Sequence, residues 1–262
     1  MPPGFDRFLQ NGSLGPGIGF GEVVTMEQLR RYGKIYLAAI ALFTVLALLA
    51  ADYSENAVIV SGQGRRAAVF VDPGHGGEDG GAVSVTGVHE SQINLEISLR
   101  LRDLLRLCGL ETAMTRKGDY ALYDTGCTII SQKKSSDLRN RVAMVLDRPD
   151  AIVLSIHQNQ FPEAKYRGAQ VFYNGNPGSK GLAEAIQSAV MRGPDRDNHR
   201  KIKPAEGIYL MEKIPNTAAL IECGFLSNPE EEALLRTPEY QKQLISAVCA
   251  GVLDYLGTQT LL

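Results

Sequence analysis

The chain has 262 residues, of which 44% are hydrophobic and 21% are charged, and its net charge at pH 7 is −2. This composition is typical of a globular protein with one sizeable core. The weakly negative charge argues against a nucleic-acid-binding protein, whose surface would be strongly basic.

The N-terminal region differs from the rest of the chain. Residues 1–29 carry no hydrophobic pattern, and we expect them to be disordered or untranslated. Residues 30–51 contain basic side chains followed by an apolar run, Ile35–Ala51. Such a segment is typical of a signal peptide or a membrane anchor, whereas a buried core helix seldom lacks polar residues over this length. We therefore expect an exported protein, either membrane-anchored or secreted to the cell wall, with residues 52–66 as a polar linker.

The rest of the chain alternates short β-branched runs with helical periodicity, a pattern that predicts an α/β fold. The apolar spacing of Ile93, Ile97 and Leu101, continued by Leu104, predicts one helix. The same spacing from Tyr240 through Leu244, Val248 and Val252 predicts another near the C-terminus. The predicted strands are residues 67–72, 111–116, 151–157, 169–174 and 217–225.

Four cysteines are spread along the chain at positions 108, 127, 223 and 249. No two of them form a CxxC pair, so the sequence contains no zinc knuckle. We expect them to be small core residues. Spacing alone leaves a disulfide open.

The stretch VFVDPGHGGEDGGA, residues 69–82, follows a strand with a glycine-rich turn. Glycines in such a place let the backbone pass close to a phosphate, a metal or another chain segment. The stretch lacks both GxxxxGK[ST] and GxGxxG, and Glu78 and Asp79 would repel an anion. The sequence therefore favours a metal over a phosphate.

Polar side chains close three of the predicted strands. His75 and His157 follow two of them, and Glu222 closes a third. In open α/β sheets, ligands gather at the carboxyl ends of the strands. Glu90 begins the next helix and supplies a carboxylate, so that two histidines, one carboxylate and one open position would form a catalytic zinc site. Glu222 would be the general base, and Asp72 would orient a ligand imidazole.

Simpler interpretations compete with each of these roles. His75 could be a capping residue, and Glu90 could only complement the helix dipole. His89 could replace Glu90 as a ligand. Cys223 next to Glu222 suggests a thiol nucleophile, but adjacent strand residues point to opposite faces, so we expect Cys223 in the core.

Three motifs in this order resemble the zinc-dependent N-acetylmuramoyl-L-alanine amidases of the amidase-3 family, which cut peptidoglycan. They are VFVDPGHGGEDGGA with Glu90, then SIHQN, then ALIECGFLSNPEEEALL. The resemblance covers residues 69–256 and implies a catalytic domain over residues 67–258. It implies a single twisted, mostly parallel sheet with helices on both faces. It also implies Zn²⁺ ligands at His75, Glu90 and His157 and a catalytic glutamate at Glu222.

Further positions match the same family. The resemblance implies that Arg116, Arg141 and Asn159, together with Asp72, support the ligands or contact the substrate. The segment 119–137 resembles the germination-specific amidases of the spore cortex, and we expect it to project from the edge of the sheet that carries the metal. Lys133 and Lys134 within it either pair with a carboxylate of the stem peptide or belong to a solvated surface loop.

These features predict a hydrolase that cleaves the amide between the lactyl group of N-acetylmuramic acid and L-alanine. The expected partners are peptidoglycan, the membrane through the N-terminal segment, and a sporulation protein. Two alternatives remain open at this point: a zinc peptidase that acts on the stem peptide, and a wall-binding module without catalytic activity.

Overall fold

The structure, a computed structural model, describes Thr44 and residues 67–259. The predicted segments 1–29, 30–51 and 52–66 lie outside the described residues, apart from Thr44. None of the helices in the described ranges is both long and apolar enough to cross a membrane.

Six strands form one sheet in the order β2-β1-β3-β6-β4-β5. Strands β2, β1, β3 and β6 run parallel, whereas β4 is antiparallel to β6 and parallel to β5. The mostly parallel sheet and its five predicted strands are confirmed. Strand β5 has only two exposed residues and no apolar signal, so the sequence pattern did not reveal it. The strands are β1 (Ala68–Pro73), β2 (Glu111–Met114), β3 (Ile152–Asn159), β4 (Gln170–Tyr173), β5 (Lys203–Pro204) and β6 (Ala218–Phe225).

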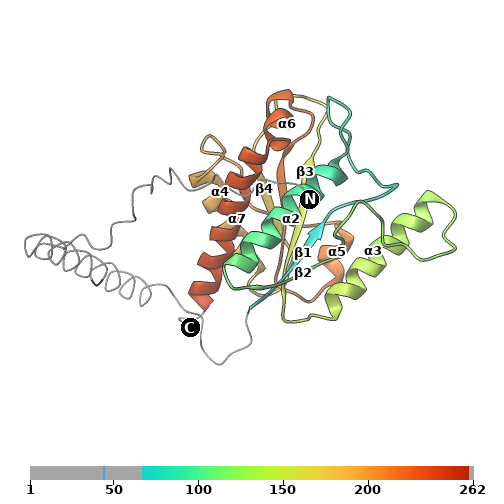
Figure 1. Cartoon of the computed structure of the whole chain (residues 1–262), viewed down its shortest axis with the longest axis horizontal. Helices are drawn as coiled ribbons and strands as arrows, with labels where there is room; N and C mark the ends of the chain where they lie inside the picture. The colour runs from blue at the N-terminus through green and yellow to red at the C-terminus, as the bar shows by residue number, and fades with distance from the viewer. Residues whose placement is uncertain (1–43, 45–66, 260–262) are drawn as a thin grey trace, which may run out of the picture. The chain divides into compact units, whose positions relative to one another are not determined.

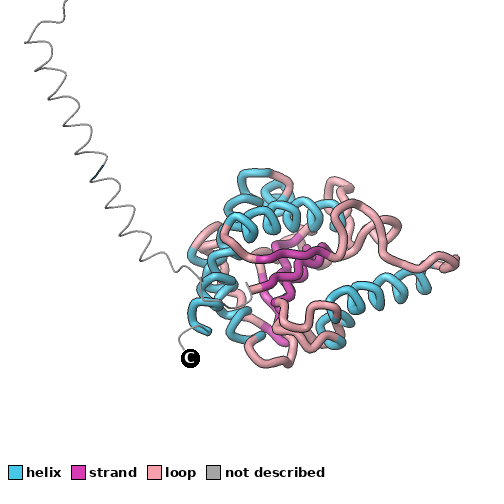
Figure 2. Tube along the Cα trace, turned by 60° about the horizontal axis from the view of Figure 1, so that its bottom comes forward, coloured by secondary structure: helices cyan, strands magenta, loops and turns pink. Residues whose placement is uncertain are grey.

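Helices cover both faces of the sheet, as predicted (Figures 1 and 2). Helices α2, α4 and α7 pack with one face into the larger apolar core. Helices α3 and α5 pack on the other face in a smaller core. The helices are α2 (Glu90–Leu107), α3 (Ile130–Leu146), α4 (Ser179–Arg192), α5 (Tyr209–Lys213), α6 (Pro229–Leu235) and α7 (Pro238–Gln259).

Strand β1, which lies between β2 and β3, shows why the strands of this sheet are continuous apolar runs in the sequence. Val69, Phe70 and Val71 are all buried, because helices cover the sheet on both sides. Val69 and Val71 face the larger core, and Phe70 faces the smaller one, since side chains alternate along a strand. Asp72 continues the Phe70 face and therefore points toward α3.

The predicted helical stripes are buried as expected. Ile93, Ile97 and Leu101 of α2 are each at most 2% exposed, and Leu105 continues the stripe more completely than Leu104 does. Because β1, β3 and β6 are parallel, their carboxyl ends meet at one edge of the sheet, and the chain after β1 returns to that edge at the start of α2.

Candidate metal centre and active site

Three side chains converge at the carboxyl edge of the sheet. His75, Glu90 and His157 offer ligand atoms that all lie within 4.8 Å of one another, and they form the one such group of three or more in residues 67–259. His75 Nε2 lies 3.3 Å from Glu90 Oε2, and His157 Nδ1 lies 2.9 Å from Glu90 Oε1. His89 lies outside this group, so the structure favours Glu90 as the carboxylate ligand.

The glycine loop brings its backbone close to these side chains. A β-carbon at Gly74 would lie 2.3 Å from the His157 ring, and one at Gly81 would lie 2.5 Å from Glu90 Oε2. Real β-carbons essentially never approach other atoms that closely. Glycine is therefore required at both positions so that the backbone can pass beside the ligands.

His75 itself has a left-handed backbone, with φ of 60°. Such a conformation is unfavourable for a residue with a β-carbon and persists only where its surroundings impose it. Two hydrogen bonds across the loop, from Gly76 N to Asp79 O and from Asp79 N to Gly76 O, close a tight turn directly after His75. The turn directs the imidazole back over the sheet edge.

Two buried arginines hold the chain in this conformation by binding consecutive carbonyl groups. Arg116 donates to the carbonyls of Pro73 and Gly74, at 3.1 and 2.9 Å. Arg141 donates to the carbonyls of Pro73 and His75, at 2.8 and 2.6 Å. Both residues are at most 2% exposed. Arg116 and Arg141 therefore hold the backbone that carries His75, and Arg141 also lines the cleft beside the two histidines.

Asp72 has a different partner from the one we predicted. Its carboxylate accepts hydrogen bonds from Thr115, Ser155 and Arg141, at 2.7, 2.8 and 2.6 Å. Burial opposes the charge of Asp72, but Arg141 and the two hydroxyls lower its pKa. Asp72 thus holds Arg141 in place, and its predicted contact with an imidazole is corrected.

The residue that orients an imidazole is Asp79. Its Oδ2 lies 2.9 Å from His75 Nδ1 and accepts a hydrogen bond from that nitrogen, which leaves Nε2 turned toward Glu90. This hydrogen bond lowers the pKa of Asp79. A carboxylate on the outer nitrogen is the usual way in which a protein fixes a ligand histidine.

Glu90 is fixed by several donors. The backbone N–H groups of Ala82 and Gln158 and the side chain of Asn94 donate to its two oxygens at 2.9 to 3.1 Å. Burial would raise the pKa of Glu90, but the hydrogen bond with His157 and the charge that His157 and His75 carry when protonated lower it to about 2. The carboxylate is therefore ionised and rigid, as a metal ligand must be.

Glu222 lies next to this group. It is paired with His157 across β3 and β6. Its Oε2 is buried and has no hydrogen-bond partner, and burial raises the pKa of Glu222 to about 7. Cys223 points to the opposite face into the larger core, where burial raises the pKa of its thiol. The thiol nucleophile is thereby disfavoured. The expected core position of the cysteines is confirmed for Cys223 and Cys249, but it is wrong for Cys108, which is exposed, and for Cys127, which is half-buried.

The donor set fits zinc. Two imidazoles and one carboxylate are the ligands of a common class of catalytic zinc sites. Atoms about 2 Å from a tetrahedral ion lie roughly 3.3 Å apart, and His75 Nε2 and Glu90 Oε2 have this separation. Oε2 of Glu222 is buried beside these ligands and has no hydrogen-bond partner. A water at the metal centre would supply that partner.

A cleft of about 250 Å³ opens beside the two histidines. Lys134 and Leu138 of α3 line one side, and Ile208, Tyr209 and Leu210 line another. Asn159 ends β3, and its carbonyl accepts a hydrogen bond from Leu226 N, at 2.8 Å. No described side-chain hydrogen bond links Asn159 to the ligands, and its substrate role stays a prediction.

The segment 119–137 lies at the same edge of the sheet. Its second half forms the first turns of α3, where Asp137 accepts hydrogen bonds from Leu122 N of the loop and from Arg141 Nε of the same helix, each at 2.6 Å. The segment is therefore partly helical and tied to the arginine that holds His75.

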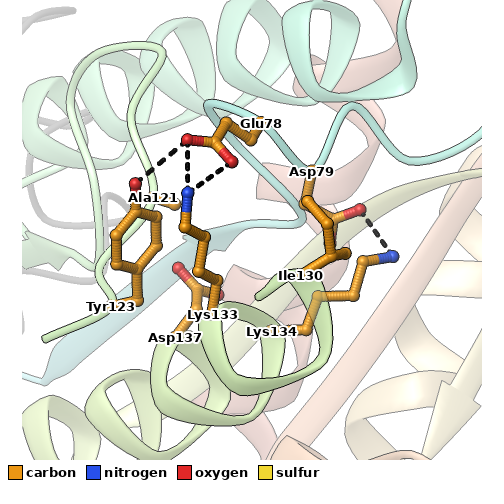
Figure 3. A pocket seen from close by; sticks show the side chains of 8 residues that line it. All are labelled: Glu78, Asp79, Ala121, Tyr123, Ile130, Lys133, Lys134 and Asp137. Carbon is orange, nitrogen blue, oxygen red and sulfur yellow. Dashed lines mark hydrogen bonds and ion pairs between the residues drawn. The ribbon is translucent and has the colours of Figure 1, made fainter. Parts of the chain in front are cut away.

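Figure 3 shows how this segment meets the glycine loop. Lys133 Nζ lies 2.7 Å from both carboxylate oxygens of Glu78, to which Tyr123 also donates a hydrogen bond. Lys134 Nζ lies 2.9 Å from Asp79 Oδ1. The two lysines thus pair with carboxylates of the chain itself, and their contact with a stem carboxylate stays a prediction.

Sequence reasoning did not assign roles to Asp79, Ser155 or Tyr209. Asp79 follows His75 by four residues in an acidic, glycine-rich turn, and this short spacing is the signal for a carboxylate beside the imidazole. Ser155 lies two residues before His157 on the same strand face, where a hydroxyl in an apolar run was a usable signal. The short helix that begins at Tyr209 has no periodic pattern of its own.

Comparisons with known proteins identify the family of the chain. A family model for N-acetylmuramoyl-L-alanine amidase matches residues 69–254. The chain is 40% identical over 188 residues to the germination-specific N-acetylmuramoyl-L-alanine amidase of Bacillus subtilis. The aligned region covers 71% of this chain and 78% of the relative.

Solved structures show the same fold. The CwlD amidase from Clostridioides difficile, in complex with the GerS lipoprotein, is 37% identical with a TM-score of 0.72, over 74% of this chain and all of that one. The amidase AmiC2 of Nostoc punctiforme is 27% identical with a TM-score of 0.64, over 75% of this chain and 99% of that one. The motifs, the sheet and the His-Glu-His group lie within the matched region, and the chain belongs to the N-acetylmuramoyl-L-alanine amidase family.

Proposed function

We propose that the chain uses one zinc ion, held by His75, Glu90 and His157, to hydrolyse the amide between the lactyl group of N-acetylmuramic acid and L-alanine. The observation that carries this proposal is the buried, unpaired Oε2 of Glu222 beside the three converging ligands. Burial of a carboxyl oxygen without a hydrogen-bond partner costs free energy. Its presence in the fold therefore indicates a function.

When bound, the zinc ion would supply Lewis acidity toward the amide carbonyl and the attacking water. Glu222 is placed to move the protons. Its raised pKa, about 7, suits a group that takes a proton from water and then gives it to the departing amino group of L-alanine. Its pairing with His157 across β3 and β6 supports this role, because it sets Glu222 beside the ligands.

The remaining residues position these groups. Asp79 holds the His75 ring by its Nδ1, and Arg116 and Arg141 hold the backbone that carries it. The cleft beside the histidines, rimmed by Tyr209, offers a partly apolar surface for the sugar or the stem peptide.

Analysis of the products from purified peptidoglycan tests the reaction. The amidase releases intact stem peptides that begin with L-alanine. A zinc peptidase acting on the stem would release internally cut peptides, and a wall-binding module would release nothing. Either of those results would overturn the proposed reaction. Glu222→Gln protein serves as the control, because it keeps the fold and the ligands.

We further propose that the substrate is the peptidoglycan of the spore cortex, where removal of whole stem peptides precedes formation of muramic-δ-lactam. The support is the identity of 40% with the germination-specific relative, and the segment 119–137 beside the site. Cortex from a null mutant of the source organism should lack the lactam. Normal lactam content would refute the cortex role and leave the amide hydrolysis standing.

Export through the segment 30–51, and a sporulation protein as a partner, belong to the same proposal. The related CwlD structure contains the GerS lipoprotein, which supports a partner of that kind here. Purification of the chain from sporulating cells under native conditions, followed by mass spectrometry, would identify such a partner. Recovery of the chain from the cytoplasmic fraction alone would contradict export.

A further inference from the structure

Two cysteines that are 141 positions apart in the sequence meet where α2 packs against α7. Cys108 follows the last turn of α2, and Cys249 lies in the middle of α7. Their sulfur atoms are 3.7 Å apart. Cys108 is exposed, whereas Cys249 is 3% exposed. This pair lies outside the site described above, and amide hydrolysis does not use it.

We propose that Cys108 and Cys249 form a redox-active thiol pair that closes to a disulfide and ties α2 to α7. A disulfide has a sulfur separation of about 2.05 Å, so the two sulfurs must approach by about 1.7 Å from their distance of 3.7 Å. Side-chain rotation and a small backbone shift at Cys108 can supply this movement.

The backbone around Cys108 suits that adjustment. Helix α2 ends there in a C-terminal motif in which Gly109, at φ 86°, donates to Arg106 O and Leu110 donates to Leu105 O. Cys108 is thus the junction between a helix and a turn, not an interior helical residue. Cys249, in contrast, is held in a packed helix, so Cys108 is the partner that moves.

The exchange needs a disulfide oxidant, such as a small-molecule disulfide or an oxidised thiol oxidoreductase. The exposed Cys108 thiolate attacks one sulfur of the oxidant, forms a mixed disulfide and releases one thiolate. Cys249 then loses its proton and attacks Cys108 Sγ, which releases the second thiolate. Two protein thiols are oxidised, and the oxidant is reduced by two electrons to two thiols.

Burial raises the pKa of Cys249 to about 12, which makes it the second nucleophile and not the first. Such oxidants are present outside the cytoplasm, where an exported chain would meet them. This order of events depends on the exposure of Cys108 and on no property of the metal site.

Closing the pair should stabilise the fold without changing catalysis. Cys108 is at the opposite end of α2 from Glu90, about 27 Å away along the helix axis at 1.5 Å per residue. A crosslink between residues so far apart in sequence restricts the unfolded chain strongly. We expect the melting temperature of the oxidised protein to exceed that of the reduced protein by roughly 5 to 15 °C.

The test compares full-length protein, purified in detergent, after treatment with oxidised glutathione or with a reductant. Free thiols are alkylated, and the protein is digested with trypsin. The expected product joins peptide 107–116 to peptide 243–262 with the loss of two hydrogens, and turnover of peptidoglycan at 25 °C stays unchanged.

Two variants sharpen the result. Cys108→Ser changes an exposed residue and should abolish both the joined peptide and the rise in melting temperature. Cys127→Ser is the matched control and should keep both. Alkylated thiols at both positions after oxidation would overturn the proposal. A rise in melting temperature that persists in Cys108→Ser would overturn it as well.

Discussion

Replacing Gly74 by alanine tests whether the glycine loop exists to bring backbone beside the ligands. The added β-carbon would lie 2.3 Å from His157 Cε1 and Nε2, whereas ordinary contact begins at 3.4 Å. The ring must therefore retreat by about 1.1 Å. Gly74 does not have a positive φ, so alanine fits its backbone and the ring takes the full displacement. A misplacement of about 1 Å at a reacting centre costs roughly 10²-fold in rate.

The assay measures release of stem peptides, zinc content and the far-ultraviolet circular dichroism of the variant. We expect a folded protein with reduced zinc and a rate lowered roughly 10²-fold. Gly175→Ala is the control, because nothing lies within 4 Å of a β-carbon there. Full zinc and full activity in Gly74→Ala would refute the reasoning that this glycine makes room for His157.

Three further outcomes are expected. Arg141→Met should lower the free energy of unfolding in urea by about 3–5 kcal/mol, because it leaves Asp72 buried without its ionic partner; a loss below about 1 kcal/mol would contradict the role of the pair. Because the pKa of Asp72 is lowered from 3.8 by folding, its ionised form stabilises the protein above that pH, and its contribution is lost as the pH falls through the folded-state pKa. The difference in unfolding free energy between the parent protein and Asp72→Asn should therefore shrink in acid. A difference that does not change with pH would count against the stabilising role of ionised Asp72. Tyr209→Ala should raise KM for peptidoglycan with zinc content unchanged, since Tyr209 lines the cleft; an unchanged KM would remove it from the substrate surface.

Hydrophobic periodicity was enough to predict the sheet and its two largest helical stripes. Buried parallel strands are nearly all apolar. The four-residue spacing of Ile93, Ile97 and Leu101 places them on one face of a helix. Strand β5 and helix α5 were not predictable in this way. They have two and five residues, and their place in the fold depends on neighbouring elements, not on a repeating pattern of their own.

The metal group was predictable because strand ends have a fixed place in a parallel sheet. His75 follows β1, and His157 lies near the carboxyl end of the adjacent strand β3, so topology alone puts them at one edge. The partners of charged residues were not predictable, since they depend on side-chain directions. Asp72 and Asp79 lie seven positions apart, yet one faces Arg141 and the other faces His75.

The central claim is that His157 holds a zinc ion, while Glu222 transfers protons without being a ligand. Metal content and turnover, measured together on His157→Ala and Glu222→Gln, test it most directly. The account predicts that His157→Ala loses most of its zinc, whereas Glu222→Gln keeps about one zinc per chain and loses roughly 10² to 10⁴ in rate. Equal loss of zinc in both variants, or full activity in Glu222→Gln, would contradict it.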